Sequence, residues 1–441
     1  LFQSDLIYTN NTYCQAMRGY GNPEVTWAIE SNLDQLAEIS GIDRLDLRRI
    51  NCNQSGDLTP MGLEISSCGL SECLEKTAEK LDFDTPRGKR RGVGLASLIH
   101  VGGSGRIYQS DASGIILRFD DFGNLYTHSG GVEMGQGLHA ALAQSVADAV
   151  GVRPERVFIV PTDTATCPWD VGTHASRGAF VACNAAIEAA GKLRTEIFAH
   201  AARFFPKLVA KSLRKHKVTS DFDFSGSPED FELRDGLLFH KNGPQESWAK
   251  VDLAQLIRTV HFRQQGEIFI ASAFYDPPTV LPDWSKGYGH LSATYAFGTQ
   301  GVEVEVDVDT GDVKILRMVA CHDVGRVLNP KTLAGQCYGA LAQGLGYSLY
   351  EEVLTEEGRV LNPSFTDYKI PTAVEMGFPI DLVFVETDDE FGPFGSKGVG
   401  EPGLVPTAPA IANAIYDAIG VRIYDLPITP QKIVAAIKEQ G

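Results

Sequence analysis

Segments with helical periodicity and segments with strand periodicity follow one another along this chain without a regular β-α-β order. Apolar residues recur every three or four positions over residues 24–50, 70–81 and 138–150, which predicts helices there. Alternating apolar residues on either side of short turns predict hairpins over residues 113–131 and 301–326. This mixture favours an α+β fold over a strictly alternating one.

Two further helices are expected over residues 182–208 and 332–350. A short echo links two of the helical segments, because residues 135–144 read GQGLHAALAQ and residues 335–343 read GQCYGALAQ. The echo suggests two related domains, although alanine-rich helices can produce such a match by chance.

The chain is acidic, with 56 Asp and Glu against 39 Lys and Arg in 441 residues and a formal net charge of −17. Such a charge repels nucleic-acid phosphates and anionic membranes, which argues against both as partners. No stretch approaches about 18 consecutive apolar residues, and the N-terminal segment lacks the features of a signal peptide. We therefore expect a cytoplasmic protein.

The eight cysteines are scattered without a C-x-x-C pair, so the thiolate spacings of zinc ribbons and ferredoxins are missing. The ten histidines form neither an H-E-x-x-H motif nor a His-x-His pair, and the chain has no G-x-S-x-G motif. We therefore expect no metal held by protein side chains, no iron–sulfur cluster in this chain and no serine nucleophile.

Three glycine-rich loops could bring the backbone close to a ligand. Residues 130–137 precede a helix, so their N–H groups and the Gln136 amide could face an anionic or planar ligand, although a turn that needs flexible φ angles explains the glycines equally well. Residues 172–178 gather hydroxyls and a guanidinium, a combination that suits phosphate. Residues 16–21 offer Arg18 and Tyr20 between glycines, able to orient a planar or carbonyl-bearing substrate.

A carboxylate near the C-terminus lies in a similar loop, GVGEPG at residues 398–403. The loop matches G-x-G-x-x-G, but about a dozen residues separate it from the preceding strand, which is the wrong context for a dinucleotide site. Glu401, between glycine and proline before a helix, could be a general base if it is buried. On local sequence alone, an ordinary capping glutamate is the favoured interpretation.

Taken together, five motifs resemble, in order, those of the molybdenum hydroxylases, the xanthine dehydrogenase and aldehyde oxidoreductase family. They are AMRGYGNPE, GGVEMGQGLH, GTHASRGAF, CHDVGRVLNP with LAGQCYGALAQGLG, and GSKGVGEPG. Essentially the whole chain resembles the C-terminal half of that family's molybdopterin-binding subunit. The resemblance implies two interlocked mixed domains, with a helical lead-in at residues 1–85 and molybdopterin-binding parts at residues 86–300 and 301–441.

In that family a molybdenum atom, held by the dithiolene of molybdopterin or molybdopterin cytosine dinucleotide, inserts water-derived oxygen at an electron-poor carbon of a heterocycle or aldehyde. Electrons leave through [2Fe-2S] clusters and FAD. The resemblance implies that Glu401 is the base acting on the metal's hydroxyl ligand, and this implication replaces the capping interpretation.

The resemblance also implies other site residues. Arg18 and Tyr20 match the family's arginine and aromatic residue beside the substrate, and Tyr108 lies where another pocket aromatic is expected if the register is ungapped. The matched cofactor-binding positions are Gly135, Gln136, Gly137, Thr173, Ala175, Ser176, Arg177, Gln336 and Gly400.

The family's earlier half has no counterpart in this sequence, nor do its iron–sulfur and flavin domains. We therefore expect either a fragment of a longer protein or a subunit that needs a second polypeptide carrying the other half. The expected partners are iron–sulfur and FAD subunits and a small-molecule substrate, in a dimer of hetero-oligomers. Two alternatives remain, namely a non-catalytic scaffold that keeps the fold and a carrier of molybdopterin.

Overall fold

The computed structural model describes residues 5, 7–10, 16–263 and 266–440, so Cys14 lies outside the described residues. The chain forms two compact units. Unit 1 comprises Leu1–Gly102, Thr294–Glu390 and Val399–Gly441, and unit 2 comprises Gly103–Ala293 and Phe391–Gly398.

Unit 1 is built on a four-stranded mixed sheet with the order β1-β9-β10-β13. The antiparallel hairpin of β9 and β10 forms its middle, β1 pairs antiparallel with β9, and β13 pairs parallel with β10. The strands are β1 (Arg91–Val101), β9 (Tyr295–Val306), β10 (Val313–Asp323) and β13 (Ile380–Val385), with a separate small hairpin of β11 (Thr355–Glu356) and β12 (Arg359–Val360).

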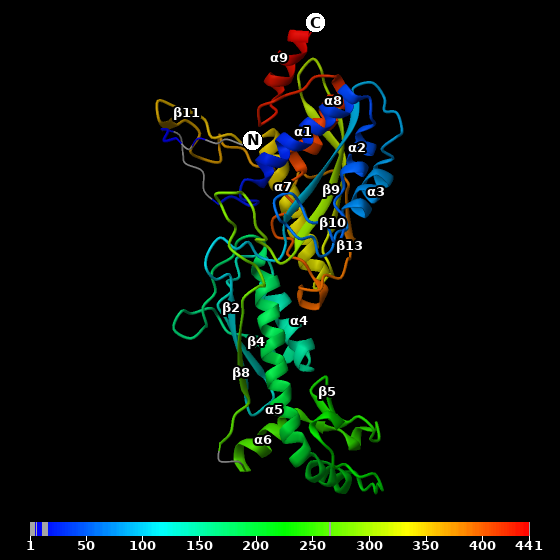
Figure 1. Cartoon of the computed structure of the whole chain (residues 1–441), viewed down its shortest axis with the longest axis vertical. Helices are drawn as coiled ribbons and strands as arrows, with labels where there is room; N and C mark the ends of the chain where they lie inside the picture. Colours follow the sequence, from blue (N-terminus) through cyan, green and yellow to red (C-terminus); the bar gives the residue numbers. More distant parts are fainter. Residues whose placement is uncertain (1–4, 6, 11–15, 264–265, 441) are drawn as a thin grey trace. The chain divides into compact units, whose positions relative to one another are not determined.

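Helices cover both faces of this sheet (Figure 1). Val93 and Leu95 of β1 face α2 and α3, where they pack with Leu45 and Leu74. The alternate residue Gly94 faces α8 so closely that a Cβ there would lie 2.2 Å from the Ala414 backbone nitrogen. Only glycine therefore permits this helix–sheet contact. The helices of unit 1 are α1 (Asn22–Ser40), α2 (Arg44–Asn51), α3 (Leu70–Leu81), α7 (Pro330–Leu349), α8 (Thr407–Ile419) and α9 (Pro430–Gln440).

Unit 2 has its own four-stranded sheet, with the order β4-β3-β2-β8, packed against α4 and the long helix α5 (Figure 1). A three-stranded sheet, β5-β6-β7, and α6 complete it. The strands are β2 (Ser113–Phe119), β3 (Leu125–Ser129), β4 (Val157–Ile159), β5 (Phe231–Arg234), β6 (Leu237–His240), β7 (Val251–Asp252) and β8 (Ile270–Tyr275). The helices are α4 (Leu138–Val150), α5 (Arg177–His216) and α6 (Leu253–Arg263), and short 3₁₀ turns lie at η1 (Pro154–Arg156), η2 (Pro228–Asp230), η3 (Ser247–Ala249) and η4 (Pro393–Gly395).

The mixed sheets and covering helices confirm the predicted α+β class. The hairpins of β2 with β3 and of β9 with β10 lie where alternation predicted them. The sequence-based division at residues 86 and 301 puts β1 and the first part of β9 in the middle segment, whereas the structure pairs both strands within the sheet of unit 1. Strand pairing between distant segments, which composition does not show, produces this arrangement.

A buried ion cluster joins α1 to α2. Arg48 lies 2.6 Å from Glu30 and 2.7 Å from Asp34, and all three side chains are at most 6% exposed. Burial raises the pKa of Glu30, and the positive charge of Arg48 opposes that rise. Arg48 therefore compensates two carboxylates that water does not reach.

We predict that Arg48→Leu lowers the free energy of unfolding by about 3–5 kcal/mol, because it leaves two buried carboxylates without their cation. The neighbouring Arg49 is the matched control, since its partners Asp46 and Glu75 are about half exposed. Arg49→Ala is expected to cost less than about 1 kcal/mol. Urea unfolding of the chain measures both, and equal losses would contradict a special role for Arg48.

Candidate functional site

The Glu401 carboxylate is the centre of a polar cluster in unit 1. Its side chain is 15% exposed, and each of its oxygens accepts a hydrogen bond from a distant part of the chain. The Gly19 backbone N–H donates to Oε1 at 3.2 Å, and Nε2 of His100 lies 3.1 Å from Oε2. Because each oxygen has its own partner, the two contacts restrict the orientation of the carboxylate.

Arg18 ties the N-terminal segment to both the Glu401 loop and α7. Its Nε donates to the Gly400 carbonyl at 2.5 Å, and its terminal nitrogens donate to the side-chain oxygens of Gln343 and Gln336 at 3.0 and 3.1 Å. The guanidinium also donates to the Gln336 carbonyl at 3.2 Å. Three sequence-predicted residues, Arg18, Gln336 and Gly400, thus meet beside Glu401.

The turn that carries Arg18 depends on glycine. Gly19 has φ +95°, and a Cβ there would lie 2.7 Å from Pro23. Tyr20 also has a positive φ, 51°, between Gly19 and Gly21, and its side chain is 67% exposed. A positive φ costs a non-glycine residue about 1 kcal/mol or more. In this conformation the Tyr20 ring is exposed to solvent next to the Gly19–Glu401 contact.

The Glu401 loop is anchored to the sheet by Gln300 of β9. The fully buried Gln300 amide donates to the Gly403 carbonyl at 2.6 Å and accepts from the Thr407 hydroxyl, at the start of α8, at 2.7 Å. Both ends of the amide are used, so Gln300 fixes the loop between Glu401 and α8.

Burial dominates the electrostatics around Arg18. It lowers the pKa of Arg18, an effect opposed by the negative charge that a Cys337 thiolate or the Glu401 carboxylate would bring. Burial also raises the pKa of the Cys337 thiol to about 12, although Arg18 pulls it down. Cys337 is therefore a protonated thiol at neutral pH.

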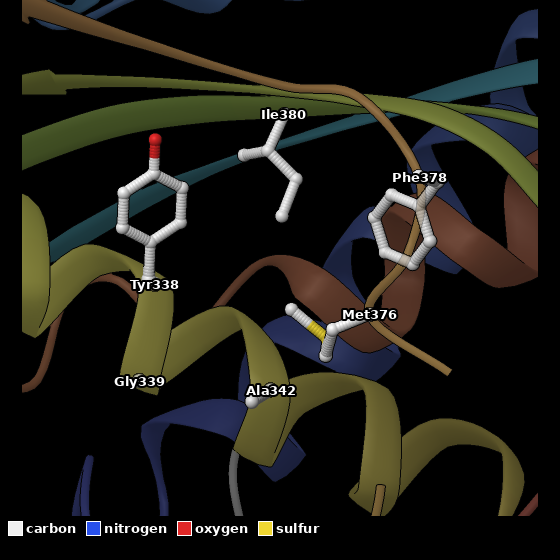
Figure 2. A pocket seen from close by; sticks show the side chains of 6 residues that line it. All are labelled: Tyr338, Gly339, Ala342, Met376, Phe378 and Ile380. Atoms are coloured by element: carbon white, nitrogen blue, oxygen red, sulfur yellow. The ribbon is translucent and has the colours of Figure 1, made fainter. Parts of the chain in front are cut away.

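An apolar groove of about 490 Å³ lies along another side of α7. Figure 2 shows Tyr338 together with Met376, Phe378 and Ile380 around this space. The same helix thus supplies Gln336 and Gln343 to the Glu401 cluster and Tyr338 to the groove. The six lining residues include no carboxylate, cation or imidazole.

In unit 2, the two predicted cofactor loops lie side by side at the start of α4 and α5. A Cβ on Gly130 would lie 2.4 Å from the Pro168 carbonyl, and one on Gly178 would lie 3.9 Å from Leu138. The N-termini of two helices therefore meet in one region, which favours negative charge.

Arg177 stabilises the second of these loops from inside. Its side chain is 1% exposed and pairs with Asp111 and Asp170 at 2.9 Å each. The same guanidinium donates to the carbonyls of Gly172, Asp111 and Ala112. Both terminal nitrogens of Arg177 thus donate to the chain itself, while its buried Nε lies 2.9 Å from Oδ1 of Asp111 without a hydrogen bond, so Arg177 stabilises the loop from inside.

The remaining residues of this loop, Thr173, Ala175 and Ser176, lie at or near the surface. Ala175 and Ser176 have φ of 48° and 55°, a conformation that costs non-glycine residues about 1 kcal/mol or more each. Tyr108 is 57% exposed, with its ring 6.3 Å from that of His174. Strained backbone held by a buried arginine is typical of a binding loop.

The first loop is stabilised by a residue that the sequence analysis missed. The Glu133 carboxylate accepts the backbone N–H groups of Gly135, Gly137 and His139, each at 2.9 Å. Burial alone would raise the pKa of Glu133, but these three hydrogen bonds outweigh it and lower the pKa. The Gln136 side-chain amide donates to the Val132 carbonyl and accepts from the Met134 N–H, which stabilises the same turn. In the sequence, the signal that could have identified Glu133 is its position five residues before the start of α4.

Sequence reasoning also missed His100, which contacts Glu401, Asn22, which contacts His100, and Gln343, which contacts Arg18. Each is distant in sequence from the residue that it contacts. The described residues contain no group of three or more His, Cys, Asp or Glu side chains that could hold a metal ion. No helix in the described part of the chain has the length and apolar character to cross a membrane.

Two family models, both described as a molybdopterin cofactor-binding domain, match residues 69–377 and residues 1–52. The chain is 33% identical over 444 residues to the xanthine dehydrogenase molybdenum-binding subunit of Escherichia coli O157:H7, covering 98% of this chain and 54% of that protein. It is 32% identical to 6-hydroxypseudooxynicotine dehydrogenase complex subunit gamma of Paenarthrobacter nicotinovorans, covering 97% of this chain and 52% of that subunit. The chain thus spans about half the length of these relatives.

Solved structures show the same fold. Quinoline 2-oxidoreductase from Pseudomonas putida 86 superposes with a TM-score of 0.79 at 24% identity, over 96% of this chain and 53% of that one. The aldehyde oxidoreductase from Desulfovibrio desulfuricans superposes with a TM-score of 0.72 at 28% identity, over 96% of this chain and 41% of that one.

We predict that Glu133→Gln lowers the free energy of unfolding at pH 7 by about 1–3 kcal/mol, through weaker hydrogen bonds to the three N–H groups. Because the pKa of Glu133 is lowered on folding, this stabilisation is present above the unfolded value of 4.5 and is lost as the pH falls through the folded value. Denaturant unfolding of the variant and wild type should therefore differ less at acidic pH. Glu188→Gln, on the exposed side of α5, is the control. A difference that does not change with pH would contradict the assignment.

Proposed function

Because the chain belongs to the molybdenum hydroxylase family, we propose that it forms the C-terminal half of a molybdopterin-binding subunit whose base is Glu401. The single observation that carries this proposal is the carboxylate of Glu401, largely buried and held by Gly19 and His100 beside the Arg18 guanidinium. In this proposal Glu401 takes up a proton at a carboxylate oxygen during oxidative hydroxylation of a heterocycle or aldehyde.

The loops of unit 2 fit a polar, anionic cofactor. They join two helix N-termini, and the positive φ angles of Ala175 and Ser176 expose backbone in a loop that Arg177 stabilises. In this proposal Gly135, Gln136, Gly137, Thr173, Ala175 and Ser176 of unit 2 bind the molybdenum cofactor, and Arg177 supports their second loop. Gln336 and Gly400 of unit 1 are proposed as cofactor-binding residues separately, from the family resemblance. When bound, the cofactor supplies water-derived oxygen and accepts two electrons from the substrate.

We propose Tyr20 and Tyr108 as substrate-binding residues, each because its own exposed ring suits face contact with a planar substrate. The Arg18 guanidinium bonds both Gly400 and Gln336 of α7. We therefore propose that Arg18 holds the Glu401 loop in position beside the substrate. We further propose that the missing half, and iron–sulfur and FAD subunits, are partners in a cytoplasmic hetero-oligomer. The chain spans about half the length of these relatives.

Glu401→Gln is expected to lower kcat/KM by about 10²–10⁴-fold, because the amide keeps the shape of the carboxylate but cannot take the proton. Steady-state kinetics of the assembled enzyme, with molybdenum content measured for each preparation, test this. Gln343→Ala is the comparison, since it loses only one bond to Arg18 and should retain most activity. Near-normal turnover by a metal-loaded Glu401→Gln enzyme would overturn the proposal.

A second prediction concerns cofactor content. Co-expression with a polypeptide that supplies the other half should give a molybdenum-to-protein ratio near one by metal analysis, whereas the chain alone should hold little molybdenum. Stoichiometric molybdenum without turnover in the assembled complex would instead support the carrier alternative. A complex without molybdenum would support the scaffold.

A further inference from the structure

Glu401 contacts a second titratable side chain, His100, near the end of β1. Its imidazole is 5% exposed, and its Nε2 lies 3.1 Å from Oε2 of Glu401. An imidazole nitrogen can donate or accept, so the effect of this contact depends on which nitrogen carries the proton.

The neighbour of His100 on its other side settles the direction of the bonds. Nδ2 of Asn22, at the first position of α1, lies 2.8 Å from the Ile99 carbonyl and 3.0 Å from Nδ1 of His100. The Oδ1 of Asn22 accepts from the Thr26 hydroxyl at 3.0 Å. A flipped amide would place two oxygens, those of Asn22 and Ile99, at 2.8 Å, so Nδ2 must be the atom that faces both Ile99 and His100.

An amide nitrogen can only donate, so Nδ1 of His100 accepts and carries no proton. The ring proton is therefore on Nε2, where it donates to Glu401. We propose that Asn22 and His100 form a positioning pair that selects the Nε2–H tautomer of the imidazole and directs its hydrogen-bond donor at the Glu401 carboxylate. The catalytic consequence rests on the proposed function of Glu401, whereas the tautomer rests on the geometry alone.

The charges near the Glu401 carboxylate explain why the tautomer of His100 matters. Glu401 contacts His100 from β1, Arg18 from the segment before α1 lies beside it, and Cys337 of α7 lies near Arg18. Arg18 already brings one positive charge. A charged imidazole would add a second, whereas a neutral ring holds the carboxylate by a hydrogen bond without adding a charge.

The tautomer also excludes His100 as the acceptor of a proton from Glu401. Its Nε2 already carries a proton, so it cannot take a proton from Glu401 at that atom. His100 is therefore a positioning residue, and the proton leaves Glu401 by another route.

Nuclear magnetic resonance of the chain labelled with ¹⁵N-histidine tests the tautomer without turnover. Among the ten histidines, the His100 signals are those that disappear in His100→Gln. We expect a protonated Nε2 and an unprotonated Nδ1 at neutral pH, and Asn22→Ala should introduce the second tautomer. Two protonated ring nitrogens, a proton on Nδ1, or an unchanged single tautomer in Asn22→Ala would overturn the pair.

Kinetics of the assembled enzyme test the consequence. His100→Phe keeps a ring but loses the donor, and should lower kcat by about tenfold or more with little change in KM. The acid limb of its kcat/KM profile should move to higher pH, because an ionised carboxylate without its donor protonates more readily. His100→Gln places an amide donor near Nε2 and should recover part of the loss. His200→Gln, at a half-buried histidine of unit 2, is the control.

The two proposals can fail separately. A fully active Glu401→Gln enzyme would end the proposed function while the ¹⁵N signals still report the tautomer. An inactive Glu401→Gln enzyme with a wild-type rate and pH profile in His100→Phe would overturn only the positioning pair.

Discussion

The position of one carboxylate depends on contacts that bring together four distant parts of unit 1. The Gly19 N–H and His100 bind the two oxygens of Glu401, while Arg18 joins the Gly400 carbonyl to Gln336 of α7. None of these contacts is local in sequence. The sheet of β1, β9, β10 and β13, with α8 pressed against glycines of β1, is what brings them to one place.

In unit 2, charged side chains stabilise the loops through hydrogen bonds to backbone groups. Glu133 accepts from backbone donors at the start of α4, and Arg177, at the start of α5, donates to the carbonyls of Asp111 and Ala112. Both loops are thereby organised by the chain's own charges. A loop fixed in this way presents backbone groups to a ligand with little further loss of conformational entropy.

The sequence predicted what depends on local periodicity. Helices α3 and α4 lie at the predicted residues 70–81 and 138–150, because apolar spacing and flanking glycine, as at Gly137, mark helix bounds. The echo around Gln136 and Gln336 has a different outcome. Gln136 precedes α4, whereas Gln336 lies inside α7, which begins at Pro330 after the cap of Asn329.

What the sequence could not predict depends on distance in the chain. His100 and Glu401 are 301 residues apart, and Arg18 and Gly400 are 382 apart, so no spacing rule connects them. The internal role of Arg177 was hidden for the same reason, since an arginine among hydroxyls suits phosphate whether or not it is buried. Family resemblance identified the motifs, and only the fold shows which side chains are already engaged.

An experimental structure of the proposed complex, with the molybdenum cofactor bound, tests the role of Glu401 most directly. We expect a carboxylate oxygen of Glu401 to lie within hydrogen-bond distance of the bound cofactor, with Gly19 and His100 still bound to the carboxylate. A cofactor seated elsewhere, or a Glu401 side chain turned away from it, would contradict the account.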